Sequence, residues 1–253
     1  MSKFHEALWQ AYAAHGRSDL PWRKLPPNPY HILVSEIMLQ QTQVPRVLPK
    51  FNEFLMKFPS LEALAAAALA DVLRAWNGLG YNRRAKYLWE AAQMCNGQLP
   101  TTHEQLVMMP GVGPNTAGAI MAYAYNQPSI FIETNVRTVY LNWFFPGQSD
   151  VPDSAIRSLL EQTLDHERPR DFYWALMDWG TVLKQSENAS RRSKHYTKQS
   201  KFEGSRRQLR GLVLRQLAAG SQPFSDDGRL AGVLEDLARE GLISQTAAGD
   251  WSL

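Results

Sequence analysis

The sequence has 253 residues, enough for one large or two modest domains with hydrophobic cores of their own. Hydrophobic residues make up 44% and charged residues 20% of the chain, which excludes a disordered or fibrous protein. No apolar run approaches the ~18 residues that a membrane-spanning helix needs, and the first residues lack the order of a secretory signal. We therefore expect a soluble, intracellular protein that contacts no membrane. The net charge of +3 hints only weakly at a polyanionic partner.

The predicted elements are nearly all helices, because apolar residues recur at three- and four-residue steps. The segments with this pattern are 1–15, 31–43, 46–57, 61–67, 69–76, 84–96, 103–109, 115–125, 135–144, 153–164 and 170–183. Proline or glycine clusters at 26–29, 78–80 and 111–114 mark helix ends. No segment before the C-terminus alternates convincingly as a strand, so the predicted fold class is all-α.

The last 50 residues have a different pattern. Two predicted helices, 205–219 and 229–240, precede a short hairpin built from 242–245 and 249–253. This order of elements is winged-helix-like, and winged helices bind DNA or contact proteins. A plain packing module is an equal alternative.

The strongest local motif is Met109-Pro110-Gly111-Val112-Gly113-Pro114, between two predicted helices. Glycines there permit positive φ and close approach of the backbone to a partner, while the free N–H groups of the second helix can bind a phosphate oxygen. An ordinary helix–helix turn is the alternative. The stretch 184–210 holds nine Lys or Arg and two acids, which indicates either phosphate contacts or a solvated linker.

Two single residues carry chemical information. Glu36 lies in an otherwise apolar predicted helix, where desolvation would raise the pKa of its carboxyl group and make it a general acid; a surface Glu on an amphipathic helix is the alternative. Cys95 is the one cysteine of the chain. It excludes a disulfide, a cysteine zinc site and a four-cysteine cluster, and we expect it to be a core residue.

Several motifs in order resemble the MutY-type adenine glycosylases of the helix-hairpin-helix (HhH-GPD) DNA glycosylase family. They are Leu20-Pro21-Trp22-Arg23, Pro29-Tyr30, the run 35–43, Trp76-x-Gly78-Leu79-Gly80-Tyr81-x-x-Arg84-Ala85, the hairpin motif and Met177-Asp178-x-Gly180, spread over roughly residues 5 to 185. The resemblance implies two helical domains with a cleft between them. We expect a six-helix barrel domain at 26–132, a terminal domain from 1–25 and 133–200, and a separate tail at 201–253.

The resemblance also implies a mechanism and a partner. The partner is double-stranded DNA with a mispaired or damaged base, which flips into a pocket of the enzyme. Glu36 would protonate the departing adenine at N7 and later help to activate water, while a second carboxylate stabilises the charge that develops on the sugar. We expect a monomer in the cytoplasm, associated with the nucleoid if bacterial.

Further site residues follow from the same resemblance. The expected DNA contacts are Gln41, which fills the gap left by the flipped base, and Arg84, Pro110, Gly111, Val112, Gly113, Thr116, Lys194 and Lys198. The expected base pocket holds Leu20, Trp22, Arg23 and Asn135. A structural Na⁺ or K⁺ would sit on the backbone carbonyls of Val107, Met109 and Val112.

The sequence departs from the family pattern at several positions. Glu133 stands where the family has its second carboxylate, an Asp, and is one methylene longer; we expect it to act in that role. Asn115 replaces the Schiff-base lysine of bifunctional relatives, which predicts a monofunctional glycosylase and leaves its amide to bond a base or water. Asn82 replaces a second Tyr that stacks beside the lesion partner.

Two larger departures concern the cofactor and the tail. The family's iron–sulfur cysteines are absent after Leu183, so we expect no cluster and no other cofactor than the hairpin cation. The tail is too short for the family's domain that checks 8-oxoguanine. Three functions thus stay open: excision of adenine opposite 8-oxoguanine or G, excision of uracil, thymine or another base by the same fold, and non-catalytic DNA binding.

Overall fold

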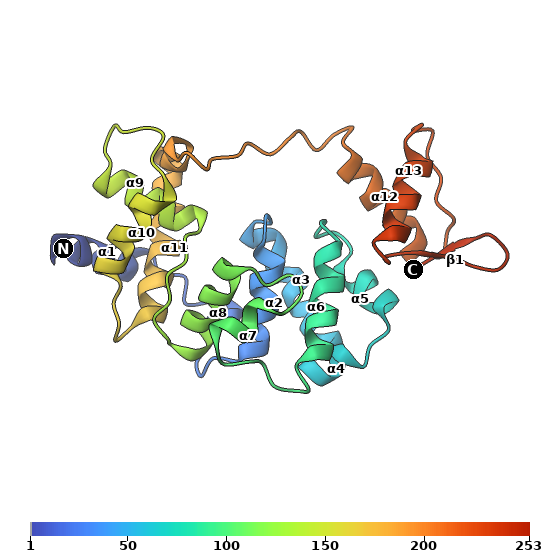
Figure 1. The fold of residues 1–253 in the computed structure, drawn as a ribbon, viewed down its shortest axis with the longest axis horizontal. Coiled ribbons are helices and arrows are strands. Elements are labelled where there is room, and N and C mark those ends of the chain that lie inside the picture. Colours follow the sequence, from blue (N-terminus) through green and yellow to red (C-terminus); the bar gives the residue numbers. More distant parts are fainter. Residues whose placement is uncertain (1) are drawn as a thin grey trace. The chain divides into compact units, whose positions relative to one another are not determined.

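The computed structural model describes residues 2–253, and its regular structure is helical apart from one C-terminal hairpin (Figure 1). No helix within this described range is long and apolar enough to cross a membrane. The all-α prediction is confirmed. The elements are α1 (Ser2–His15), η1 (Pro21–Arg23), α2 (Pro29–Leu39), α3 (Val44–Lys57), α4 (Leu61–Ala65), α5 (Leu69–Trp76), α6 (Arg83–Met94), α7 (His103–Val107), α8 (Pro114–Tyr125), α9 (Thr134–Phe144), α10 (Asp153–Thr163), α11 (Pro169–Ser186), η2 (Ala189–Arg192), α12 (Arg206–Ala218), α13 (Leu230–Arg239), β1 (Ser244–Gln245) and β2 (Trp251–Ser252).

Contacts divide the chain into two compact units. Unit 1 contains the chain up to Ile32 with Thr101–Val107 and Val112–Lys198, and unit 2 contains Leu33–Pro100, Met108–Gly111 and Gln199–Leu253. Unit 1 therefore takes α8, which packs on α11, and unit 2 takes the tail, because α12 packs on α5. The three domains that we expected, 1–25 with 133–200, 26–132 and 201–253, are divided differently and stay a prediction.

The core of unit 1 forms around α11, which lies beside α9 (Figure 1) and also packs on α1. Gly180 permits the close approach of α9, since a Cβ atom there would lie 2.7 Å from the Cβ and the carbonyl oxygen of Asn135. The ring of Tyr173 stacks on Phe131 at 3.8 Å between centroids, and its hydroxyl donates to the Ser129 carbonyl at 2.6 Å. The segment leading into α9 is thereby fixed on α11.

Unit 2 packs α4 and α5 against α6, and α3 against α5. Trp76 at the end of α5 is fully buried, and so is most of α2. Helix α2 ends at Leu39, so our predicted end at residue 43 is wrong. The reason lies in the next residues: Gln41 has a left-handed φ of 55°, and α3 begins at Val44 with proline at its second position. The buried Cys95 is a core residue, as predicted, and burial raises the pKa of its thiol to about 11.

The tail has the winged-helix-like order of elements that we predicted. Ser205 caps α12 by accepting a hydrogen bond from the Gln208 N–H, and β1 pairs antiparallel with β2. Glu240, just after α13, forms ion pairs with Arg83 of α6 at 2.6 Å and with Arg210 of α12 at 2.5 Å. Its carbonyl accepts from Lys86 at 2.7 Å. The tail is thus joined to the rest of unit 2 by charged as well as apolar contacts.

Candidate active site and DNA interface

Glu133 lies at the N-cap of α9, where the extended segment from Phe131 meets the helix. Its side chain is half-buried. Burial raises the pKa of the Glu133 carboxyl, while the positive charges of Arg137 and Lys184 act in the opposite direction. The carboxylate is therefore held in a desolvated place with two cations near it, an arrangement in which a negative charge acts strongly on a nearby positive one.

Lys184 is a residue of this site that the sequence analysis missed. Its ammonium donates to the Asn135 Oδ1 at 2.6 Å. Burial lowers the pKa of Lys184, and the charge of Glu133 opposes that shift. No sequence signal distinguishes Lys184 from the other lysines of 184–210, because only the packing of α9 on α11 brings it to Glu133.

Asn135, which we expected in the base pocket, uses both ends of its amide inside unit 1. The oxygen accepts from Lys184, and the Nδ2 donates to the Met177 carbonyl at 3.0 Å. Its role as a base contact stays a prediction. In the structure it links α9 to α11 and holds Lys184.

Asn115, at the position of the lysine nucleophile in bifunctional relatives, faces the backbone of Ile132. Its Nδ2 donates to the Ile132 carbonyl at 3.3 Å, and its Oδ1 accepts from the Ile132 N–H at 3.4 Å. The amide thus pairs with both backbone groups of one residue, as a residue of an adjacent strand would. Because Ile132 precedes Glu133, Asn115 fixes the backbone that carries the carboxylate, a role that differs from the base or water contact that we considered.

Glu36 is half-buried in the middle of α2. Its neighbours Leu33, Val34, Ser35, Ile37 and Met38 are all buried. These buried neighbours favour a partly desolvated carboxyl group over the alternative of a surface Glu on an amphipathic helix. Glu36 belongs to unit 2 and Glu133 to unit 1, and the catalytic role of each stays a prediction.

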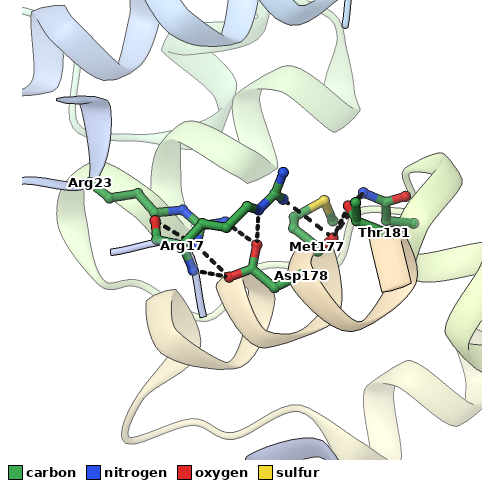
Figure 2. Close-up of polar contacts among 6 residues, drawn as sticks. Arg17, Arg23, Met177, Asp178 and Thr181 are labelled. Atoms are coloured by element: carbon green, nitrogen blue, oxygen red, sulfur yellow. Dashed lines mark hydrogen bonds and ion pairs between the residues drawn. The ribbon is translucent and has the colours of Figure 1, made fainter. Parts of the chain in front are cut away.

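A buried ion cluster fixes the segment that we expected beside the base pocket. Figure 2 shows both carboxylate oxygens of Asp178 facing two arginines. Arg23 binds at 2.6 and 3.0 Å, and Arg17 at 2.7 Å through its Nε. The Arg23 guanidinium also lies 5.3 Å above the Trp174 ring. The charge of Arg23 is thus neutralised by Asp178, a residue whose role the sequence did not reveal, while pocket roles for Leu20 and Trp22, both buried, stay predictions.

In the hairpin motif, only one of the two glycines needs a left-handed backbone. Gly111 has a φ of 77°, and a Cβ atom there would lie 2.9 Å from Tyr87. Gly113 has a φ of −84°, so the positive φ that glycine permits is not used at this position. Instead, Gly113 is the exposed N-cap of α8 with open space around it, where a side chain would cover the free N–H groups. Val112 and Met109 are buried.

The expected DNA contact of Arg84 is wrong. The side chain is 7% exposed, and its guanidinium donates to the carbonyls of Ile37, Met38, Gln40 and Gly80 and to the Thr42 hydroxyl, at 2.5–3.0 Å. Burial lowers the pKa of Arg84 to about 10. Arg84 therefore satisfies the last carbonyls of α2, which have no partner within the helix.

The remaining expected DNA contacts lie at exposed or half-exposed positions. Lys194 and Lys198 are exposed in the segment after η2, and so is Gln41 between α2 and α3. Pro110 and Thr116 are half-buried. The contacts of these residues with DNA, and the cation on the carbonyls of Val107, Met109 and Val112, stay predictions.

Known proteins resemble this chain in sequence over nearly its whole length. The model of the HhH-GPD superfamily base excision DNA repair protein matches residues 34–164. The adenine DNA glycosylases of Mycobacterium tuberculosis (strain ATCC 25618 / H37Rv) and Mycolicibacterium smegmatis are 32% and 33% identical, covering 96% and 94% of this chain and 91% and 92% of those proteins. That of Buchnera aphidicola subsp. Baizongia pistaciae is 33% identical over 71% of this chain, and the match spans 52% of that protein.

Solved structures give the same fold. A thermostable thymine-DNA glycosylase superimposes with a TM-score of 0.61 at 25% identity, covering 72% of this chain and 87% of that one. An endonuclease III–DNA covalent intermediate gives a TM-score of 0.59 at 19% identity, with 72% and 86% covered. The relatives that are similar in sequence are named adenine DNA glycosylases, and the matching family is one of base excision repair proteins, which removes the alternative of a non-catalytic DNA-binding protein. As its motifs predicted, the chain belongs to the HhH-GPD superfamily of base excision DNA repair proteins, and it is a DNA glycosylase.

Proposed function

We propose that this protein removes adenine opposite 8-oxoguanine or G from duplex DNA by hydrolysing the N-glycosidic bond. The observation that carries the proposal is the similarity to adenine DNA glycosylases over more than nine-tenths of the chain. The surroundings of Glu133 support it, because they suit a carboxylate that faces a developing positive charge.

The proposed chemistry divides between two carboxyl groups. Glu36 protonates N7 of the flipped adenine, which weakens the bond to the sugar, and then accepts a proton from the attacking water. Glu133 stabilises the cationic sugar. The positive charges of Arg137 and Lys184 favour the ionised form of Glu133 against the effect of burial, and the ionised form is the one that this role needs.

We propose that the enzyme is monofunctional and leaves an abasic site in an uncut strand. Position 115 carries an amide that is paired with Ile132 and cannot form a Schiff base. The amine of Lys184, the lysine near Glu133, is already bound because it donates a hydrogen bond to Asn135. Borohydride reduction during turnover should trap no covalent protein–DNA product, and a trapped product would contradict this proposal.

We further propose that the enzyme acts as a monomer without an iron–sulfur cluster. The residues of the chain do not fit such a cluster, because the one cysteine is buried in α6's C-cap and none follows Leu183. Iron analysis of the purified protein and sedimentation with DNA test these two points.

A structural Na⁺ or K⁺ at the hairpin would make DNA affinity depend on which monovalent cation is present.

The substrate is tested with duplexes that carry A:8-oxoguanine, A:G, U:G, T:G or hypoxanthine, followed by alkali to reveal abasic sites. We expect cleavage in the two adenine lanes. Cleavage only with U:G or T:G would contradict the adenine proposal. It would favour excision of uracil or thymine by the same fold, which the similarity to a thymine-DNA glycosylase supports.

The two carboxyl roles are tested by Glu36→Gln and Glu133→Gln. Each variant should lose at least about 10²-fold in single-turnover rate and should bind DNA like the wild type. Glu53→Gln is the matched control, because Glu53 is an exposed Glu that pairs with Lys50 on α3. Near-normal turnover of Glu133→Gln would show that Glu133 is not the second carboxylate.

A further inference from the structure

Unit 2 contains a cavity of about 710 Å³ that the proposed chemistry does not use. Its walls come from three parts of the chain: the turn between α2 and α3, the loop from Asn77 to Asn82, and the tail with α12. The volume lies in the range of cavities that hold small molecules, about 300–1,000 Å³. The tail closes this cavity, so the cavity exists only because α12 packs on the rest of unit 2.

The cavity is lined by groups of three kinds. Amide side chains line it from all three parts of the chain, including Gln41, Asn82 and Gln208. One exposed aromatic ring lines it, that of Phe202, which is 55% exposed. The charged groups are four arginines and a single acid, Asp227, and that acid is paired with Arg229 at 2.5 Å. The cavity therefore has a net positive lining.

Most of these arginines already have partners. Arg207 donates to the Tyr81 hydroxyl at 2.6 Å and to the Ser200 carbonyl, and Arg46 donates to the Gly78 carbonyl. The guanidinium of Arg215, on the exposed side of α12, has no hydrogen bond or ion pair with any described residue. Arg215 is thus a cation that is available to a ligand, with an exposed phenyl ring in the same cavity.

We propose that this cavity binds one unstacked nucleotide of the DNA on which the enzyme acts. Phe202 stacks on the base, the amides of Asn82 and Gln208 contact its edges, and Arg215 binds the phosphate. Aromatic rings and arginines together are the chemistry by which proteins hold unpaired nucleotides. The proposal rests on the proposed action on DNA, and it gives the tail a role in holding the substrate.

The test uses the whole protein and a duplex with an uncleavable abasic-site analogue, so that no excision is needed. The fluorescent base 2-aminopurine is placed at successive positions of both strands around the analogue. At one position, Phe202→Leu should change the emission of the complex about twofold. Phe224→Leu is the control, because Phe224 is also an exposed phenylalanine of the tail, at 71%, but does not line the cavity.

The phosphate contact is tested by anisotropy titrations over a range of salt concentrations. Arg215→Ala should weaken binding about tenfold and lower the slope of log Kd against log salt by about one, and Arg215→Lys should restore the slope. Arg239→Ala, an exposed arginine of α13 outside the cavity, should bind as the wild type does. Free deoxyadenosine monophosphate should not compete with the duplex; competition would mean that the cavity is a site for a free nucleotide.

The proposal is overturned if Phe202→Leu leaves the emission unchanged at every position, or if Arg215→Ala behaves like Arg239→Ala. The excision assay on A:8-oxoguanine separates this result from the proposed function. Wild-type excision together with control-like variants overturns the cavity proposal alone. Absence of adenine excision together with the expected effects of both variants overturns the proposed function alone.

Discussion

At the scale of single residues, the candidate site consists of Glu133, which stands where the family has an Asp, and the residues that hold Glu133 in place. Glu133 is longer than the family's Asp, and its position depends on Asn115, through Ile132, and on the two cations beside it. Lys184 in turn depends on Asn135. How well the longer side chain can fill the proposed role therefore depends on these neighbours as much as on Glu133 itself.

The raised pKa of Glu133 predicts an effect on stability. A carboxyl group whose folded pKa lies above its ordinary value stabilises the fold below that value, and this contribution is lost as the pH rises through the folded pKa. The Glu133→Gln variant has no ionisable carboxyl group at this position, so it does not lose this stability as the pH rises. Its Tm should match the wild type near pH 4.5 and exceed it by a few degrees at pH 8. Thermal unfolding at both pH values checks this, with Glu53→Gln as a control; a Tm difference that shrinks with rising pH would contradict it.

Asn115→Ala should lower kcat about tenfold, because the backbone N–H and C=O of Ile132 lose their hydrogen bonds to the Asn115 side chain and Glu133 is less well positioned. DNA affinity should stay unchanged. Single-turnover rates and binding are measured beside Asn126→Gly, which removes two similar bonds at the other end of α8, to Glu167 and from Arg170. Equal rates for the two variants would refute a positioning role for Asn115.

At the scale of elements, the end of α2 shows how a motif residue can have a structural role. Arg84 belongs to α6, yet its guanidinium binds the carbonyls with which α2 ends. Glu36 lies on that helix. The arginine thus fixes the helix that carries the proposed general acid, and Arg84 of the family motif has a packing role where we expected a DNA contact.

Arg84→Ala should destabilise the protein by about 3 kcal/mol, because it leaves buried carbonyls without donors. For a chain of this length the Tm should fall by roughly 6–12 °C. Arg74→Ala is the control, since Arg74 is an exposed arginine paired with Asp71 on α5, and such pairs contribute little. Two variants with equal Tm values would contradict the buried role of Arg84.

At the scale of the whole molecule, the tail is part of unit 2 and not an independent appendage. The covalent link between the tail and the preceding chain is the stretch from Lys194 to Gly204, which is exposed and has no helix or strand. Its attachment is made by α12 on α5 and by Glu240 between Arg83 and Arg210. The covalent link and the packing contacts can therefore be separated by experiment.

Limited trypsin digestion should cut first after Lys194, Lys198 and Lys201, because these lysines lie in exposed chain without regular structure. The tail fragment should still co-elute with the rest of the protein in gel filtration, because its packing contacts remain after the cut. Glu240→Ala should release more of the nicked tail than Glu235→Ala, because Glu235 is an exposed residue of α13, the helix that Glu240 follows. First cuts within the helices of unit 2, or equal release by both variants, would contradict this account.

The sequence by itself determined the helical fold, the family and the positions of Glu36 and Glu133, because helix periodicity and motif order are local properties of the chain. It also gave the tail's order of elements and the place of Cys95 in the core. Only the tertiary structure decided that Arg84 holds α2, that Asp178 joins Arg17 and Arg23, that Asn115 and Lys184 support the Glu133 segment, and that the tail closes a cavity. The physical reason is that each of these roles depends on contacts between residues far apart in the chain. A local sequence pattern does not specify which distant groups a side chain will contact.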